Sequence, residues 1–108
     1  MKQGYIYTLE LEDGFWYVGY SEDTSTRIAS HFLGAGAKWT KLHRPIRITE
    51  VRPGCRHLEN LVTISLMCIH GHEKVRGGGF TNVEMKAPTC IQTATRYAKP
   101  AIEDEADP

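Results

Sequence analysis

At 108 residues the chain is long enough for one domain with a modest core and too short for two. Apolar residues make up 41% of it and charged residues 24%, a composition that is typical of a globular domain and excludes a fibrous or low-complexity chain. Without a long apolar run or a start that resembles a signal peptide, the sequence predicts no membrane span and a cytoplasmic location.

The zero net charge is divided unevenly along the chain. Residues 1–23 carry one base against five acids, and residues 24–56 carry seven bases against one acid. A basic central stretch of this kind indicates a phosphate-binding surface, because phosphate groups attract clustered lysine and arginine side chains. A solvated surface without a ligand is the alternative, since runs of charge often have no other role.

The first predicted element is a β-hairpin. Residues 4–11, GYIYTLEL, alternate roughly between apolar and polar side chains and are rich in β-forming residues. The turn signal EDG at residues 12–14 supplies the positive-φ positions of a tight turn, and FWYVGY at residues 15–20 returns as the second strand. The tripeptides YIY and YVG therefore lie side by side in this prediction.

A helix is predicted next, over residues 21–34, SEDTSTRIASHFLG. Serine and aspartate near its start can cap it, and a glycine can end it. Arg27 and His31 are four residues apart, so they project from the same face of this helix.

The rest of the chain alternates between loops and shorter elements. We expect a loop at 34–45 (GAGAKWTKLHRP), a strand at 46–51 (IRITEV), a helix at 56–70 with an apolar stripe, irregular structure at 75–80 (VRGGGF) and a short strand at 81–85. This order predicts an α+β fold with a small three-stranded antiparallel sheet flanked by helices. The domain is expected to span 1–87, with 88–108 an irregular, partly disordered acidic tail.

Several of these features together resemble the GIY-YIG nucleases, a family named for two tripeptides on adjacent strands. The features are YIY and YVG, a helix with R and H, the loop GAGAKWT, the RP pair, and Glu59 early in the next helix. The similarity covers residues 4–70 and is strongest to the compact single-domain branch of the family. Tyr5 replaces the first glycine, and Tyr20 follows the second tripeptide where relatives often have a smaller residue or lysine. Neither Asn60 nor Asn82 can be assigned to the late asparagine of many relatives.

The resemblance implies a metal-dependent endonuclease that hydrolyses DNA phosphodiester bonds and leaves a 5′-phosphate and a 3′-hydroxyl. The implied catalytic residues are Tyr7, Tyr17, Arg27, His31 and Glu59. Glu59 would hold Mg²⁺ or Mn²⁺, and Arg27 would bind the scissile phosphate. One tyrosine would act as general base with its pKa lowered, and the sequence leaves open whether this is Tyr7 or Tyr17.

DNA is the implied partner, and its strandedness stays open between single-stranded, branched and duplex forms. The candidate DNA-binding residues are Lys38, Trp39, Thr40, Lys41, Arg44 and Arg76. Core packing is the alternative for Trp39, and a flexible loop for Arg76. A homodimer or a protein partner could supply specificity. Two other functions are considered: a nucleic-acid-binding module that has lost cleavage, and a structural domain whose hairpin aromatic residues only pack.

Overall fold

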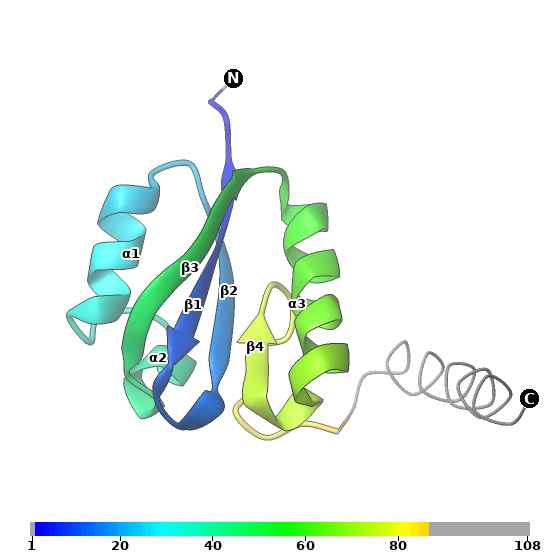
Figure 1. Ribbon diagram of the computed structural model, residues 1–108. Helices are drawn as coiled ribbons and strands as arrows, with labels where there is room; N and C mark the ends of the chain where they lie inside the picture. Colours follow the sequence, from blue (N-terminus) through cyan, green and yellow to red (C-terminus); the bar gives the residue numbers. More distant parts are fainter. Residues whose placement is uncertain (1, 87–108) are drawn as a thin grey trace, which may run out of the picture.

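In the computed structural model, residues 2–86 form the α+β fold predicted from the sequence (Figure 1). Its elements in chain order are β1 (Tyr5–Leu11), the 3₁₀ turn η1 (Glu12–Gly14), β2 (Trp16–Ser21), α1 (Thr24–Phe32), α2 (Lys38–Leu42), β3 (Pro45–Pro53), α3 (Arg56–His70), the 3₁₀ turn η2 (His72–Lys74) and β4 (Val75–Gly77). The tail expected at 88–108 lies outside the described residues. Within the described part of the chain, no helix is long and apolar enough to cross a membrane.

The sheet has four strands in the order β3-β1-β2-β4, so the prediction of three antiparallel strands was incomplete. β1 pairs with β2 and with β3 in antiparallel fashion, whereas β4 pairs with β2 in parallel. The added strand comes from the glycine-rich segment that was expected to be irregular. Gly77 makes this possible, because a Cβ atom there would lie 2.2 Å from the carbonyl oxygen of Val18 on the neighbouring strand.

The hairpin has the expected turn. Asp13 and Gly14 both adopt positive φ, at 62° and 80°. The register places Tyr7 opposite Gly19, and Tyr17 opposite Leu9. The two tripeptides therefore lie side by side, as the sequence predicted.

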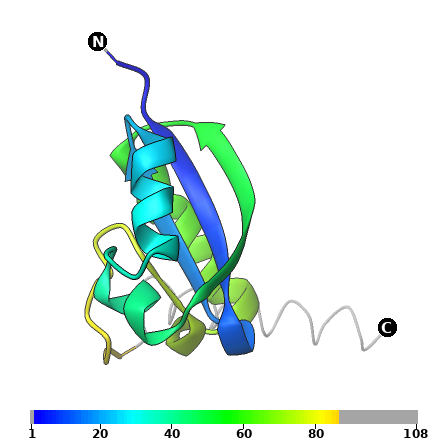
Figure 2. The same ribbon diagram turned by 90° about the vertical axis from the view of Figure 1, so that its left-hand side faces the viewer.

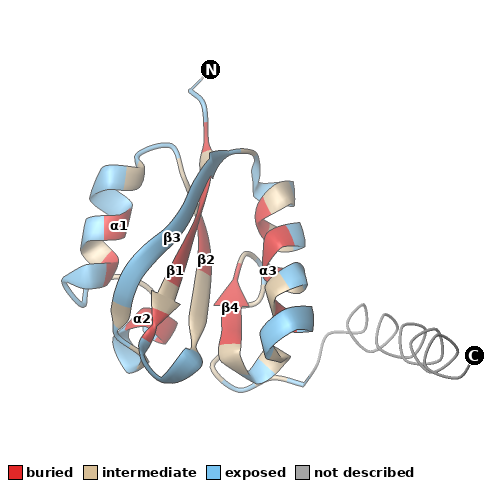
Figure 3. Cartoon of the chain, viewed as in Figure 1, coloured by how far each residue is buried: buried red, intermediate tan, exposed pale blue. Residues whose placement is uncertain are grey.

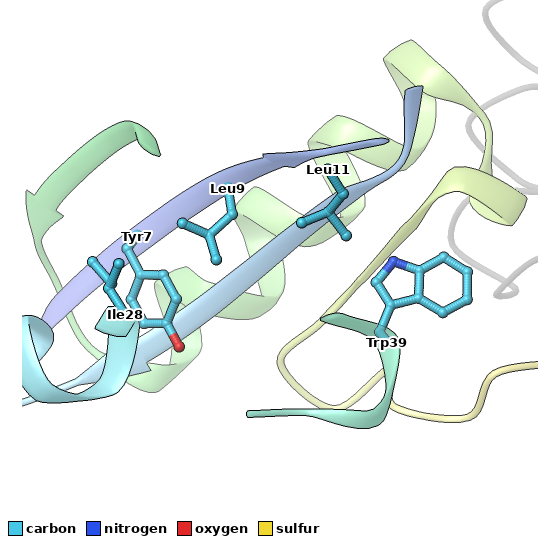
Figure 4. Close-up of a cluster of buried hydrophobic side chains, with 5 residues drawn as sticks. All are labelled: Tyr7, Leu9, Leu11, Ile28 and Trp39. Carbon is cyan, nitrogen blue, oxygen red and sulfur yellow. The ribbon is translucent and has the colours of Figure 1, made fainter. Parts of the chain in front are cut away.

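Helices cover both faces of the sheet: α1 and α2 lie on one face and α3 on the other (Figures 1 and 2). Alternation along β1 explains this, because successive side chains point to opposite faces of a strand. The core on the α1/α2 face contains Tyr7, Leu9, Leu11, Ile28 and Trp39 (Figure 4). On the α3 face, Ile6 and Val18 pack against Val62. Strand β3 is exposed along almost its whole length (Figure 3).

Two further segments differ from the sequence prediction. The expected loop at 34–45 contains the short helix α2, which turns Trp39 and Thr40 inward. The expected strand at 81–85 is absent, and two carbonyl groups of this segment accept hydrogen bonds from Arg76. By contrast, the predicted helix at 56–70 has the bounds of α3.

Strand β4 is short, and this opens one edge of the sheet. It pairs with residues 16–18 of β2, so residues 19–21 of β2 have no partner on that side among the described residues. Helix α1 lies on one face of this free edge and the N-terminal half of α3 on the other (Figure 1). We call this region the α1–α3 gap.

Candidate active site

The two tyrosines of the hairpin project from the sheet face that α1 covers. Their ring centroids lie 6.3 Å apart, and each ring also contacts the imidazole of His31, at 5.6 Å from Tyr7 and 4.9 Å from Tyr17. Gly19 allows this arrangement, because a Cβ atom there would lie 2.1 Å from Tyr7 Cζ. The glycine of the second tripeptide thus leaves space for the tyrosine ring of the first.

A chain of buried hydrogen bonds starts at Tyr7. The Tyr7 hydroxyl lies 2.7 Å from His31 Nε2, and His31 Nδ1 lies 2.9 Å from Thr40 Oγ1. Thr40 Oγ1 in turn donates to the carbonyl oxygen of Ala37 at 2.9 Å. Gly36 packs directly on the imidazole, since a Cβ atom there would lie 2.1 Å from Nδ1. All three side chains of this chain are at most 1% exposed.

The protons of this chain are assigned from its heavy atoms. The Thr40 hydroxyl has a single proton, which goes to Ala37, so Thr40 Oγ1 accepts from His31 Nδ1–H. His31 Nε2 is then the acceptor for the Tyr7 hydroxyl. The backbone N–H of Ala37 also points to Nδ1, but at 3.4 Å it is the longest contact of the group. His31 is neutral here, because burial and the Arg27 cation lower its pKa to about 4.

Arg27 lies one helical turn before His31 on α1, and its own side chain is exposed. Burial raises the pKa of the Tyr7 and Tyr17 phenols above its ordinary value. The Arg27 guanidinium opposes this rise, because its positive charge favours the ionised phenols. The helix thereby brings a cation to both tyrosines, and the shared face predicted for Arg27 and His31 serves one site.

Glu59 enters the same region from the first turn of α3. The residue is 8% exposed, and burial raises the pKa of its carboxyl group, while the Arg56 cation and the backbone N–H of Gly78 lower it. Its charge raises the pKa of both Tyr7 and Tyr17, so the carboxylate lies within electrostatic reach of the two phenols. Tyr7, Tyr17 and His31 are thus in direct contact, and Arg27 and Glu59 lie near enough for their charges to act on both phenols.

The donor set around Glu59 fits one kind of metal ion. No group of three or more histidine, cysteine, aspartate or glutamate residues that could hold a metal ion occurs in residues 2–86, so a cage made wholly of side chains is not formed there. A single buried carboxylate suits a hard cation that keeps several waters and binds phosphate oxygens as well. The residues present therefore fit Mg²⁺ or Mn²⁺ held jointly with a substrate.

The predicted DNA-binding residues divide into two groups. Lys38, Lys41 and Arg44 are exposed, on or next to α2. Trp39 and Thr40, by contrast, are 4% and 1% exposed, so neither offers a surface to DNA. The expectation for these two residues is corrected by the short helix, which turns both of their side chains inward. Trp39 packs edge-on against Phe15 in the core, and Thr40 holds His31.

Arg76 is the third correction, because its guanidinium is directed into the protein. It is 2% exposed and donates to the carbonyl oxygens of His72, Val75, Asn82 and Val83. Its guanidinium carbon also lies 4.5 Å from the centroid of the Trp39 ring. Arg76 thus holds the segment after β4 against the core, and the carbonyl groups of residues 82 and 83 are occupied by this contact.

Three contributions at the site were missed by sequence reasoning. Thr40 sets the orientation of His31, although its place in the loop GAGAKWT had suggested a phosphate contact. Asn60, which had no assigned role, accepts a hydrogen bond from the backbone N–H of Gly79 at 2.8 Å and so anchors the glycine loop beside Glu59. Arg56 was counted only as part of the basic stretch. No local pattern distinguishes these residues, since their partners lie on other elements.

The fold and the site define a small α+β domain with a tyrosine-rich, arginine-containing site and one buried carboxylate. The sequence profile of the GIY-YIG catalytic domain matches residues 3–58. The chain belongs to this family, and thereby to the GIY-YIG nuclease superfamily. The expected resemblance is confirmed at this level.

Relatives of similar sequence include three UPF0213 proteins. The protein BH0048 of Halalkalibacterium halodurans is 48% identical over 44 residues, which is 41% of this chain and 47% of the relative. The protein SSP2268 of Staphylococcus saprophyticus is 44% identical over 48 residues, 44% of this chain and 58% of the relative. The protein spr1390 of Streptococcus pneumoniae is 41% identical over 46 residues, 43% of this chain and 46% of the relative. The matched segment thus spans about half the length of these curated relatives. No solved structure matches the chain.

Proposed function

We propose that this chain is a divalent-metal-dependent endonuclease that hydrolyses phosphodiester bonds of DNA. The observation that carries the proposal is the convergence of five side chains from four elements at the α1–α3 gap: Tyr7, Tyr17, Arg27, His31 and Glu59. A domain that only packed its hairpin aromatic residues would not need an arginine and a carboxylate beside them. An intact set of this kind also favours cleavage over a binding module that has lost it.

Tyr7 is the general base in this proposal, because its hydroxyl has a proton acceptor in place. As Tyr7 takes a proton from the attacking water, its own hydroxyl proton moves to His31 Nε2, which is neutral and 2.7 Å away. The water oxygen forms a bond to phosphorus, and the bond from phosphorus to the 3′ oxygen breaks. The 3′ oxygen takes a proton from solvent, and His31 later returns its proton to solvent through Tyr7.

Charge on the phosphoryl oxygens is stabilised from both sides of the gap. The Arg27 guanidinium can bind two of these oxygens at once. A cation held by Glu59 would act there as a Lewis acid. Tyr17 is more exposed than Tyr7 and orients the water and the phosphate through its hydroxyl.

The substrate in this proposal is DNA, in single-stranded or branched form. The exposed cations Lys38, Lys41 and Arg44, on or next to α2, contact backbone phosphates in this proposal. A second copy of the chain or a protein partner would supply any further specificity, which sedimentation of the protein with and without DNA can test.

Cleavage of labelled single-stranded, duplex and branched DNA, with Mg²⁺ or with chelator, tests the function. The key variant is Glu59→Gln, which keeps an acceptor for the Gly78 N–H and removes the charge. We expect metal-dependent cleavage by the wild type and a loss of about 10³-fold in the variant, the scale of removing a main electrostatic group. The matched control is Glu73→Gln, whose side chain is 76% exposed in η2 and which should cleave like the wild type. Binding of DNA without cleavage, unchanged by Glu59→Gln, would instead indicate an inactive binding module.

A further inference from the structure

The surroundings of Tyr20, the residue that follows the second tripeptide, indicate a further contact with DNA. Tyr20 lies on the α3 face of β2, opposite Ile6 of β1. Its ring rests on the backbone of Gly4, since a Cβ atom at Gly4 would lie 2.2 Å from the Tyr20 hydroxyl oxygen. The hydroxyl end of the ring is therefore fixed against the residue just before β1.

One face of the Tyr20 ring is covered by Arg56, the first residue of α3. The guanidinium carbon of Arg56 lies 4.6 Å from the centroid of the Tyr20 ring, within the range of a cation–π contact. Such stacking leaves the edges of a guanidinium free to donate hydrogen bonds. Because Arg56 occupies this face of the ring, the face is not open to a DNA base.

Arg56 has no ion-pair partner among residues 2–86, although it is close to a carboxylate. It precedes Glu59 by three residues, so both side chains leave α3 on one face, with Cβ atoms about 5–6 Å apart. The Arg56 cation lowers the pKa of Glu59. The guanidinium is thus held beside the proposed cation site by an aromatic ring, without being neutralised by a salt bridge.

Arg56 and Tyr20 also line a hollow of about 470 Å³ at the end of the α1–α3 gap. Its remaining lining residues are Lys2, Ser21, Glu22 and Asp23. Asp23 accepts a hydrogen bond from the backbone N–H of Thr26 as the cap of α1. The carboxylates of this wall repel phosphate, so a DNA strand in the hollow would place its phosphate on the Arg56 wall.

We propose that Arg56, held in place by Tyr20, binds the phosphate next to the scissile one. The inference rests on the proposed function, because the scissile phosphate is defined by Arg27 and Glu59. Arg56 precedes Glu59 by three residues on α3 and lines the hollow at the open end of the same gap. It therefore fixes the register of the strand and takes no part in the chemical step.

Salt dependence of binding tests this contact, with all variants made in the Glu59→Gln background so that DNA is not cut. Fluorescence anisotropy of a labelled single-stranded oligonucleotide is measured over a series of KCl concentrations. Arg56→Ala should weaken binding about 5–10-fold and make the slope of log K against log salt shallower by about 0.7, the value for one lost phosphate contact on a single strand. The matched control is Arg52→Ala, an exposed arginine of β3 that pairs with Glu50 and should bind like its parent.

Two variants separate the effect of the Arg56 charge from the effect of its stacking on Tyr20. Arg56→Lys should keep the salt slope but bind more weakly, since lysine keeps the charge and loses the planar stacking. Tyr20→Leu should also keep the slope and weaken binding about 2–5-fold, because the charge is present but less well held. An unchanged affinity in Tyr20→Leu would overturn the supporting role of the tyrosine.

A scan of single methylphosphonate substitutions, which make one phosphate neutral at a time, identifies the phosphate concerned. In the parent protein, the scissile position and one adjacent position should each weaken binding, and in Arg56→Ala the adjacent position should have no further effect. Equal scans and equal salt slopes in both proteins would overturn the inference. If the protein with native Glu59 shows metal-dependent cleavage while these scans are equal, the proposed function stands and only the Arg56 site fails. If it neither cleaves nor binds DNA, both proposals fail.

Discussion

On the sheet face covered by α1 and α2, Tyr7, His31 and Thr40 are buried and hydrogen-bonded to one another, whereas on the α3 face Glu59 and Arg56 are charges without an ion pair among the described residues. Tyr7, His31 and Thr40 form a closed hydrogen-bond chain, and every buried side-chain nitrogen and oxygen in the described residues has a partner. Glu59 and Arg56 form no ion pair within the described part of the chain. The first face carries a proton acceptor that is already assembled. In the proposed function, a metal cation and substrate phosphates bind to the charges of the second face.

The largest effect is expected where the two faces meet, at Arg27. Arg27→Ala should lower the single-turnover rate of DNA cleavage about 10³-fold, because it removes the cation proposed to bind the scissile phosphate. Arg27 is exposed, so its loss should leave thermal unfolding nearly unchanged. The rate is measured with excess protein over labelled DNA, with Arg52→Ala as control. A rate within threefold of the wild type would contradict the role assigned to Arg27.

Burial of neutral His31 should make the protein less stable in acid. The folded protein holds His31 with a pKa of about 4, below the value near 6.5 expected in the unfolded chain. As pH falls from about 6.5 to about 4, the unfolded state therefore binds a proton that the folded state does not. Stability should fall over this window by roughly 3 kcal/mol and change no further through His31 below it.

Urea unfolding at several pH values between 7 and 4 checks this prediction, in wild type and His31→Gln. Carboxylates titrate over part of the same window in both proteins, so the difference between the two curves isolates His31. The difference should be largest between pH 6.5 and 4. Parallel curves would show that His31 binds a proton in the folded state as readily as in the unfolded chain.

Sequence reasoning succeeded where a residue's role depends on its own element. The bounds of α3, the Asp13-Gly14 turn and the shared face of Arg27 and His31 follow from local periodicity and turn chemistry. Reasoning failed where a role depends on a distant partner. Helix α2 is only five residues long and has no side-chain cap at its start, so no pattern marked it. The inward direction of Trp39 follows from contacts that only the fold creates.

The same limit explains the fourth strand and Arg76. Three consecutive glycines predict irregular structure by propensity alone. Here the first of them is required, because it allows β4 to approach Val18. Arg76 was assigned to a phosphate contact, with a flexible loop as the alternative, because it lies beside glycines that let a backbone approach closely. The carbonyl groups that hold it come from segments on both sides of β4, which the sequence does not place together.

Thr40→Val tests the hydrogen bond that Thr40 accepts from His31 on the face covered by α1 and α2. Valine has nearly the shape of threonine but cannot accept from His31 Nδ1–H, so the imidazole loses the bond that fixes its tautomer. We expect kcat to fall by about 10–100-fold with KM unchanged, and stability to fall by about 1–3 kcal/mol from the unpaired N–H. Thr40→Ser keeps the hydroxyl and should restore most of both. Equal kcat values for the valine and serine variants would indicate that the tautomer is set by something other than Thr40.

Gly78 and Gly79 form a matched pair for testing the α3 face. The effects on stability and cleavage expected there are the smallest. Gly78 has φ of 54°, and a Cβ atom there would lie 2.1 Å from Asn60 Oδ1, whereas a Cβ atom at Gly79 would lie 3.8 Å from the same oxygen. Gly78→Ala should therefore destabilise the protein by about 1–2 kcal/mol, through backbone strain and displacement of the loop.

The displaced loop also withdraws the Gly78 N–H from Glu59, so the pKa of Glu59 should rise further. Cleavage at pH 6 should then need more Mg²⁺ in Gly78→Ala than in the wild type, and the difference should narrow as the pH is raised, because a higher pH favours the ionised carboxyl group in both proteins. Gly79→Ala should match the wild type in stability and in Mg²⁺ requirement. If the two alanine variants behave alike, the loop is not part of the charged face, and Glu59 depends on α3 alone for its position.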